Sequence, residues 1–202
     1  NVGGTYYCYV MTNYDTDRMY CYDVTDVKNP VPNTAFGNNG MIDLSGFGIT
    51  DANNVTVDAA GNIYVCCNTG AGSKGDTVFK LDAKGANVLA KGAVEECFGI
   101  CQVGEYLAVC TMNKESSVVV ILNQSDLTTV KTINYDSVTK FSQIGFANDK
   151  LYIADEGPDA VATSTTISIP EPAAAPDASG DASAPATADA LSVAVMALMA
   201  SA

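Results

Sequence analysis

The chain has 202 residues, of which 23 are acidic and 10 are basic, and its formal net charge is −13. No Lys or Arg cluster is present to neutralise phosphates, so this charge argues against nucleic-acid binding and against electrostatic docking to anionic lipid head groups. The sequence contains no histidine, which argues against the Ser-His-Asp and Cys-His arrangements of the commonest hydrolases.

Three segments repeat one pattern, in which a tight turn precedes a short apolar strand. They are Ala59–Cys66, Val103–Cys110 and Asn148–Asp155, and they begin roughly 43 residues apart. A recurrence at this period predicts a repeat architecture, because one small sheet cannot bury its own apolar faces and must stack against copies of itself.

The first third of the chain fits the same repeat, because the apolar segments Met19–Tyr22, Val78–Leu81 and Val119–Leu122 are each closed by a polar residue. In the second unit the predicted strands cover residues 54–58, 62–67, 77–81 and 87–91. Four short antiparallel strands per repeat are typical of a propeller blade. We therefore predict an all-β, β-propeller-like fold with about four visible four-stranded antiparallel blades, in a domain of residues 1–169 whose units span about 3–50, 51–94, 95–138 and 139–169.

Two segments resemble known propeller repeats. Asn54–Val65 resembles the opening of a blade in NHL-type and gluconolactonase-like propellers, and Tyr22–Val31 resembles the LVIVD-type blade ending. The resemblance implies the architecture but not the chemistry, since propellers of one shape serve as enzymes, adhesins and scaffolds. Propellers of this kind usually have six or more blades. The four visible units therefore fit a partial or processed chain, a four-bladed ring, or copies that associate to complete a larger ring.

Seven cysteines favour an oxidising, extracellular compartment. We expect Cys8 to face Cys21 across one hairpin, and Cys97 to face Cys110 across another, with Cβ atoms close enough for disulfides. The alternative is that they are buried small apolar residues. Three cysteines are left without an assigned partner: Cys66, Cys67 and Cys101. Zinc is disfavoured, because the chain has neither histidine nor paired Cys-x-x-Cys motifs.

We interpret the acidic character first as a source of solubility, and on this interpretation the domain needs no cofactor. The alternative is calcium, because hard cations take oxygen ligands. The weak candidates for its ligands lie in predicted loops and are Asp15, Asp17, Asp155 and Glu156. None of these runs matches a recognised calcium loop.

Two sequons predict N-glycosylation, at Asn54 and at Asn123, the latter at a strand end before a turn.

After Ile169 the composition changes to Pro, Ala, Ser, Asp, Thr and Gly, so residues 170–190 are predicted to form a disordered linker. Residues 191–202 are apolar and too short to span a bilayer. A small-residue site, a polar spacer and an apolar end form the pattern of a glycolipid-anchor signal. The alternative is a weak helix that docks on a partner.

Tyrosines are concentrated in the first unit, on both faces of its predicted hairpin: Tyr6, Tyr7, Tyr9, Tyr14, Tyr20 and Tyr22. Tyr is enriched at recognition surfaces. The alternative is that these tyrosines pack between blades.

We expect a secreted or cell-surface binding or structural interaction module whose partner is a protein, a glycan or copies of itself. The alternative function, which rests on the family resemblance, is a divalent-metal-dependent, lactonase-like hydrolase that uses groups such as Asp155, Asn113 or Asn68.

Overall fold

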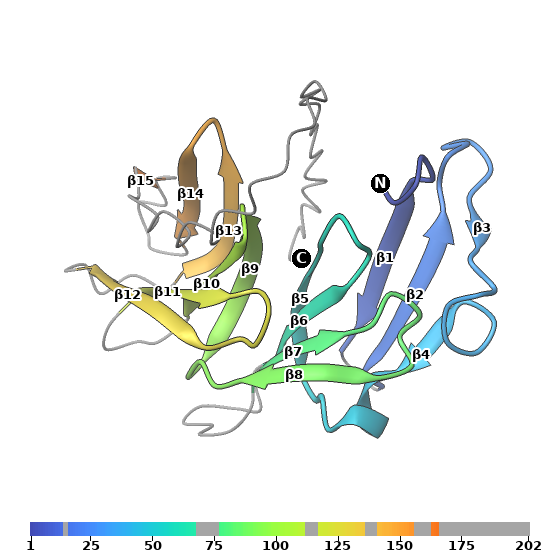
Figure 1. Cartoon of the computed structure of the whole chain (residues 1–202), viewed down its shortest axis with the longest axis horizontal. Coiled ribbons are helices and arrows are strands. Elements are labelled where there is room, and N and C mark those ends of the chain that lie inside the picture. Colours follow the sequence, from blue (N-terminus) through green and yellow to red (C-terminus); the bar gives the residue numbers. More distant parts are fainter. Residues whose placement is uncertain (14–15, 68–76, 112–116, 136–140, 156–162, 166–202) are drawn as a thin grey trace, which may run out of the picture. The chain divides into compact units, whose positions relative to one another are not determined.

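The computed structural model describes residues 1–13, 16–67, 77–111, 117–135, 141–155 and 163–165. All of these residues belong to one compact unit, Asn1–Ile167. The strands pair into four antiparallel sheets (Figure 1), which confirms the predicted all-β class. The predicted linker and apolar segment, residues 170–202, lie outside the described residues.

The first sheet contains β1 (Tyr7–Thr12), β2 (Arg18–Asp23), β3 (Val31–Pro32) and β4 (Met41–Asp43), followed by a 3₁₀ turn, η1 (Leu44–Phe47). The second contains β5 (Ala52–Val57), β6 (Ile63–Cys67), β7 (Val78–Leu81) and β8 (Val88–Gly92). The third contains β9 (Cys97–Val103), β10 (Tyr106–Thr111), β11 (Ser117–Asn123) and β12 (Thr129–Tyr135). The fourth contains β13 (Phe141–Ala147), β14 (Lys150–Asp155) and β15 (Thr163–Thr165).

Neighbouring strands in the last three sheets follow one another in chain order. The first sheet differs, because β2 pairs with β3 at its end and with β4 at its start. These two short strands therefore share the third position of the sheet. The strands predicted for the second unit lie within two residues of β5–β8. Within the described ranges, no helix is long and apolar enough to cross a membrane.

Tight turns join the first two strands of the last three sheets. In the second sheet, Asp58 Oδ1 accepts a hydrogen bond from the backbone N–H of Asn62 at 2.8 Å, and Gly61 has a φ of 87°. In the fourth sheet, Asn148 and Asp149 have φ angles of 51° and 58°. Positive φ at both central residues is the geometry that fits a two-residue hairpin to the twist of its strands.

The first and second sheets pack face to face. Met19 and Cys21 of β2 join Ile63, Val65 and Cys67 of β6 in one buried cluster. The second and third sheets pack in the same way through a second cluster, which includes Tyr64 and Cys66 of β6 and Leu107 and Val109 of β10. Every residue of β6 is buried, because one face of this strand meets the first sheet and the other meets the third.

The third and fourth sheets repeat this arrangement, with β9 and β10 against β13. Ala108 and Cys110 lie on the face of β10 opposite to Leu107 and Val109, and both are buried. A side chain on Gly99, which pairs with Cys110, would lie 3.1 Å from the backbone nitrogen of Ile144. We call the face that a sheet turns toward the preceding sheet its leading face, and the face toward the next sheet its trailing face.

Phe36, in the loop between β3 and β4, is fully buried and closes one end of the first interface. Its ring stands edge-on to Tyr9, with centroids 5.7 Å apart. Gly85 lies in the β7–β8 turn with a φ of 64°, and a Cβ atom at this position would lie 2.8 Å from Cε2 of Phe36. The turn therefore requires glycine both for its backbone conformation and for this close approach.

We expect Gly85→Ala to lower the free energy of unfolding by about 3 kcal/mol, since left-handed strain and overpacking add. Gly104→Ala is the matched control, because Gly104 has a φ of 58° and open space around a Cβ atom. It should cost only about 1 kcal/mol, from the backbone strain alone. Urea unfolding of the three proteins measures both values, and equal losses for the two variants would contradict the proposed contact.

Candidate functional site

The first sheet has one face against the core and one face without a neighbouring sheet among the described strands. In β1 the burial alternates: Tyr7, Tyr9 and Met11 pack against the core, whereas Cys8 and Val10 are exposed. Cys8 pairs with Tyr22 and Val10 pairs with Tyr20. Directly paired residues of antiparallel strands project from the same face. The open face therefore displays these four residues together with Pro32 and Met41, which pair with Tyr22 and Tyr20.

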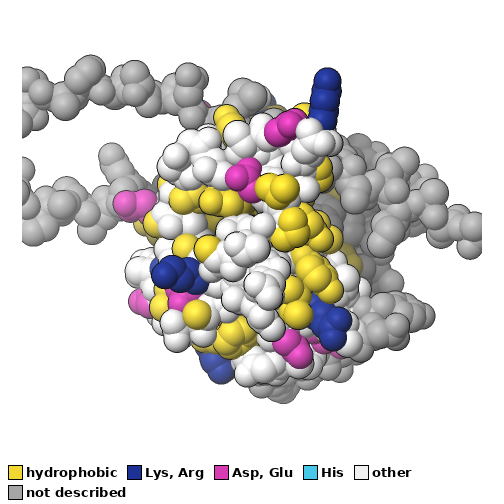
Figure 2. All heavy atoms as spheres, turned by 90° about the vertical axis from the view of Figure 1, so that its right-hand side faces the viewer, with side chains coloured by type: hydrophobic (Ala, Val, Ile, Leu, Met, Phe, Trp, Pro, Cys, Tyr) yellow, Lys and Arg dark blue, Asp and Glu magenta, His cyan; other side chains and the backbone are white. Residues whose placement is uncertain are grey.

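This open face is mainly apolar. Val10 is 45% exposed, and Tyr20 and Tyr22 are half-buried. Figure 2 shows the β1–β4 side of the molecule, where hydrophobic side chains gather across the surface and charged side chains lie mostly toward its margins. Contiguous exposed apolar surface of this kind marks interaction sites on proteins.

The tyrosines predicted to form a recognition surface do not all lie on the open face. Tyr20 and Tyr22 lie on the open face, whereas Tyr7 and Tyr9 pack against the core. Tyr6 precedes β1 and is 54% exposed, and Tyr14 lies outside the described residues. Cys8, Val10, Pro32 and Met41 also belong to this surface, and the sequence did not predict them, because a strand pattern shows two faces but not which of them stays open.

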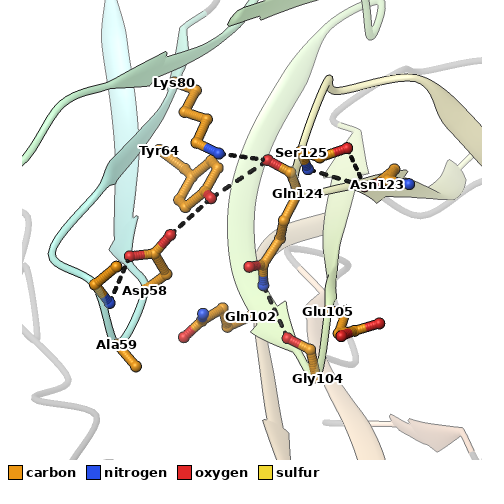
Figure 3. Close-up of a pocket in the computed structure, with 11 residues that line it drawn as sticks. Asp58, Ala59, Tyr64, Lys80, Gln102, Gly104, Glu105, Asn123, Gln124 and Ser125 are labelled. Carbon is orange, nitrogen blue, oxygen red and sulfur yellow. Dashed lines mark hydrogen bonds between the residues drawn. The ribbon is translucent and has the colours of Figure 1, made fainter. Parts of the chain in front are cut away.

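A polar groove of about 540 Å³ lies between the second and third sheets (Figure 3). Asp58 accepts a hydrogen bond from the Tyr64 hydroxyl at 2.9 Å. Lys80 Nζ donates to the backbone oxygen of Gln124 at 3.0 Å and lies 5.6 Å from the centre of the Tyr64 ring. The Gln124 amide nitrogen donates to the backbone oxygen of Gly104 at 2.9 Å.

These contacts fill the groove between the two sheets with hydrogen-bonded polar groups. Burial and the neighbouring Asp58 raise the pKa of the Tyr64 hydroxyl, so it remains a proton donor at neutral pH. The Lys80 and Gln124 donors contact backbone oxygens of the third sheet. The groove therefore stabilises the packing of the sheets through the hydrogen bond from Lys80 of the second sheet to Gln124 beside the third.

The predicted register of the two cysteine hairpins is wrong. Cys21 pairs with Tyr9 instead of Cys8, and it is buried while Cys8 is exposed. The hairpin closes at Thr12 and Arg18, because Asp17 is held elsewhere: its backbone oxygen accepts from Leu44 N–H and its carboxylate accepts from Ala52 N–H. A shift of one residue moves a side chain to the opposite face.

In the third sheet the predicted pair Cys97–Cys110 is also out of register. The turn occupies Gly104 and Glu105, so that Gly99 pairs with Cys110 and Cys97 pairs with Thr111 beyond a bulge. The physical reason is the positive φ of Gly104, which places the turn one residue later than predicted. All seven cysteines are free thiols in this structure.

Three of the thiols lie together where β6 crosses β9. Cys97 Sγ is 3.1 Å from the backbone oxygen of Cys67, and Cys66 Sγ is 3.1 Å from that of Phe98. Burial raises the pKa of Cys66 and raises the pKa of Cys67, Cys101 and Cys110 to about 12. These four thiols are therefore protonated and unreactive at neutral pH.

We expect iodoacetamide at pH 7.5 to alkylate Cys8 in the folded chain at least ten times faster than any of the five buried cysteines, because only Cys8 is exposed. Peptide mass spectrometry at increasing times measures the rates. Unfolding in urea should make all seven thiols react at similar rates, which serves as the control. Rapid labelling of Cys66 or Cys110 in the folded chain would contradict the described packing.

Asp17 is the one weak calcium candidate whose side chain lies within the described residues. Asp17 is used in the contact with Ala52, Asp15 and Glu156 lie outside the described residues, and the side chain of Asp155 does as well. Asn113 and Asn68 also lie outside them. Within the part of the chain that the structure describes, no three Cys, Asp or Glu side chains converge on a common metal position.

The two sequons differ in their surroundings. The Asn54 side-chain nitrogen, which a glycan would occupy, donates to Gln143 Oε1 at 2.7 Å. The Asn123 side-chain oxygen accepts from the hydroxyl of Ser125 at 2.9 Å. Glycosylation stays a prediction at both positions, and Asn123 remains the better acceptor because its contact leaves the nitrogen available.

No protein-family model matches the sequence, and no curated protein matches it. The structure is similar to the computationally designed Ika4 protein, with a TM-score of 0.50 and 6% identity over 79% of this chain and 86% of that chain. It is also similar to Sqt1 from Saccharomyces cerevisiae, with a TM-score of 0.51 and 10% identity over 74% of this chain and 39% of Sqt1. BamB from Moraxella catarrhalis aligns with a TM-score of 0.44 and 16% identity, over 73% of this chain and 37% of BamB.

The four antiparallel sheets match those of propeller proteins. The predicted β-propeller repeat fold is therefore confirmed, without assignment to a sequence family. At these identities the likeness concerns the fold alone.

Proposed function

We propose that this domain is a non-catalytic interaction module, secreted or displayed at a cell surface, that engages a partner protein through the open face of its first sheet. The observation that carries the proposal is the exposure of Val10 beside Tyr20 and Tyr22, on a sheet whose other face packs against the core. Tyr supplies broad contact area with a polar tip at low entropic cost.

The chemistry of the domain supports a binding role. The polar groove has its principal donors bonded within the protein, and the cysteine thiols at the β6–β9 crossing are buried. Interaction sites, in contrast, need accessible apolar and aromatic groups with few charges at their centre. The residues of the open face have this character: two tyrosines, Val10, Met41, Pro32 and a thiol.

The proposed location rests on composition. Seven cysteines in a chain of this length fit an oxidising compartment, and a Pro/Ala/Ser-rich segment such as residues 170–190 fits an extracellular stalk. An acidic chain of net charge −13 stays soluble outside the cell, while the uncharged centre of the open face remains free to bind.

A photo-reactive benzoyl-phenylalanine at position 10 tests the proposed surface. We add this variant to intact cells of its natural source and irradiate them. We expect covalent adducts between the variant and a partner protein, and mass spectrometry of the adducts identifies the cross-linked peptide of that partner. The matched control carries the same group at position 89, because Leu89 of β8 is 53% exposed but lies away from the open face. An excess of unlabelled chain should abolish the adducts of the position-10 variant.

The two positions give distinguishable results. Protein adducts at least ten times more abundant at position 10 than at position 89 support the proposal. Equal adducts at both positions, or none at position 10, contradict it. Adducts only with sugars would replace the protein partner by a glycan, and hydrolysis of a lactone by calcium-loaded chain would contradict the non-catalytic role.

A further inference from the structure

We propose that Cys66 and Cys97 form a disulfide that joins the second sheet to the third when the chain folds in the presence of a thiol oxidant. Two features of the fold bring this pair together: the crossing of β6 and β9, and the face of each strand on which its cysteine lies. The inference shares with the proposed function only the oxidising compartment, because it concerns the junction of these two sheets and not the open face.

The two cysteines face each other across the junction. Cys66 lies on the trailing face of the second sheet and Cys97 on the leading face of the third, and both belong to the cluster buried between these sheets. Neither has any exposed surface. Cα atoms of β6 and β9 approach within 8 Å of each other, closer than the about 10 Å that usually separates packed sheets. A disulfide spans Cα atoms about 4.4 to 6.8 Å apart, so the close crossing brings this bond within reach.

The contacts of the two sulfur atoms are reciprocal. Cys66 Sγ lies 3.1 Å from the backbone oxygen of Phe98, the residue after Cys97. Cys97 Sγ lies 3.1 Å from the backbone oxygen of Cys67, the residue after Cys66. Each sulfur therefore reaches the backbone beside the other cysteine. Their closeness also affects their acidity, because a hydrogen bond from the Cys66 thiol lowers the pKa of Cys97.

Hydrogen bonds fix the start of β9 against the second sheet. The hydroxyl of Thr77, which is fully buried, donates to the backbone oxygen of Val94 at 2.6 Å and accepts from its N–H at 2.8 Å. The side-chain nitrogen of Asn53 in β5 donates to the backbone oxygen of Cys97 at 3.3 Å. Cys97 is therefore held beside β6 by contacts with two different parts of the second sheet.

Cys67 is the competing partner for Cys97. Cys67 Sγ lies 3.5 Å from the backbone oxygen of Thr77, and Cys97 Sγ lies 3.3 Å from the same oxygen. The side chain of Cys67, however, belongs to the cluster that packs against the first sheet, because neighbouring residues of a strand point to opposite faces. Cys66 is the one of the two that shares a cluster with Cys97.

A small-molecule disulfide such as oxidised glutathione is the oxidant that the bond requires. The Cys97 thiolate attacks one sulfur of this disulfide, which forms a mixed disulfide and releases one glutathione. The Cys66 sulfur then attacks Cys97 Sγ, which forms the Cys66–Cys97 bond and releases the second glutathione. Two cysteine thiols are oxidised, one glutathione disulfide is reduced, and the two cysteine protons end on the released thiolates. Because both sulfurs are buried in the folded chain, the exchange precedes the packing of the two sheets.

Refolding in a glutathione redox buffer tests the bond in the full chain. The chain is reduced, unfolded in urea and refolded in this buffer, and its free thiols are then blocked with iodoacetamide. We expect trypsin to release residues 29–74 joined to residues 92–114, and fragmentation of this pair in a mass spectrometer to locate the bond at Cys66 and Cys97. The chain kept under reductant, in which all seven cysteines are free, should give the two peptides separately.

Cys66→Ala and Cys67→Ala are matched variants, because the two residues are adjacent, fully buried and on opposite faces of β6. Cys66→Ala should lower the yield of joined peptides at least ten-fold, whereas Cys67→Ala should leave it unchanged. Circular dichroism verifies that both variants are folded. The wild-type chain should melt about 5 °C or more lower with reductant than without it, and reductant should not change the melting temperature of Cys66→Ala.

Several results would overturn the inference. They are the absence of joined peptides after refolding, a wild-type bond that uses Cys67, Cys101 or Cys110 in place of either cysteine, and an undiminished yield in Cys66→Ala. These results leave the proposed function untouched if position 10 still forms photo-adducts with a partner protein. Conversely, a Cys66–Cys97 bond in a chain that forms no such adducts would support the disulfide and exclude the proposed binding surface.

Discussion

Face-to-face packing between successive sheets is the interaction on which the rest of this structure depends. Each sheet is too small to bury its own side chains, and the buried residues of β6 and β10 are divided between two neighbouring sheets. Burial of one Leu, Ile or Val contributes about 1.5 to 3 kcal/mol, so the junctions outweigh the tight turns in energy. The turns instead determine the register in which each sheet presents its two faces.

This dependence also explains where binding surface occurs. The second and third sheets have both faces occupied, but the first sheet has one face without a neighbouring sheet among the described strands. In the first sheet that face carries Val10, Tyr20 and Tyr22, which are side chains of the kind that the inner sheets bury. The polar groove is different in character: Lys80 Nζ and the Tyr64 hydroxyl both donate to the backbone oxygen of Gln124 and so hold two sheets together.

The sequence predicted the fold because the repeated turn and strand are local signals. Asp58, Gly61 and Asn62 specify one turn through their own side chains and backbone angles, and apolar residues follow at once. This is why the strands of the second sheet were predicted within two residues. The wholly apolar β6 has no alternation, and it could be recognised as a strand from its length and flanking turns.

The cysteine pairs and the open face could not be predicted from local signals. The register of the first hairpin depends on Asp17, whose contacts with Leu44 and Ala52 join residues far apart in the sequence. One residue of shift separated Cys8 from Cys21. Likewise, the tyrosine-rich segment predicted a recognition surface, but only the packing of β2 shows which of its two faces is occupied.

The most direct test of this account is native-state hydrogen exchange of the dilute chain, followed for each strand. If stability comes from the junctions, a sheet with one neighbour opens before a sheet with two. We expect the amides of β6 and β10 to exchange only through global unfolding, and those of β2 to exchange at least ten times faster through local opening. Protection of β2 equal to that of β6 in the single chain would contradict the claim that packing between sheets governs this structure.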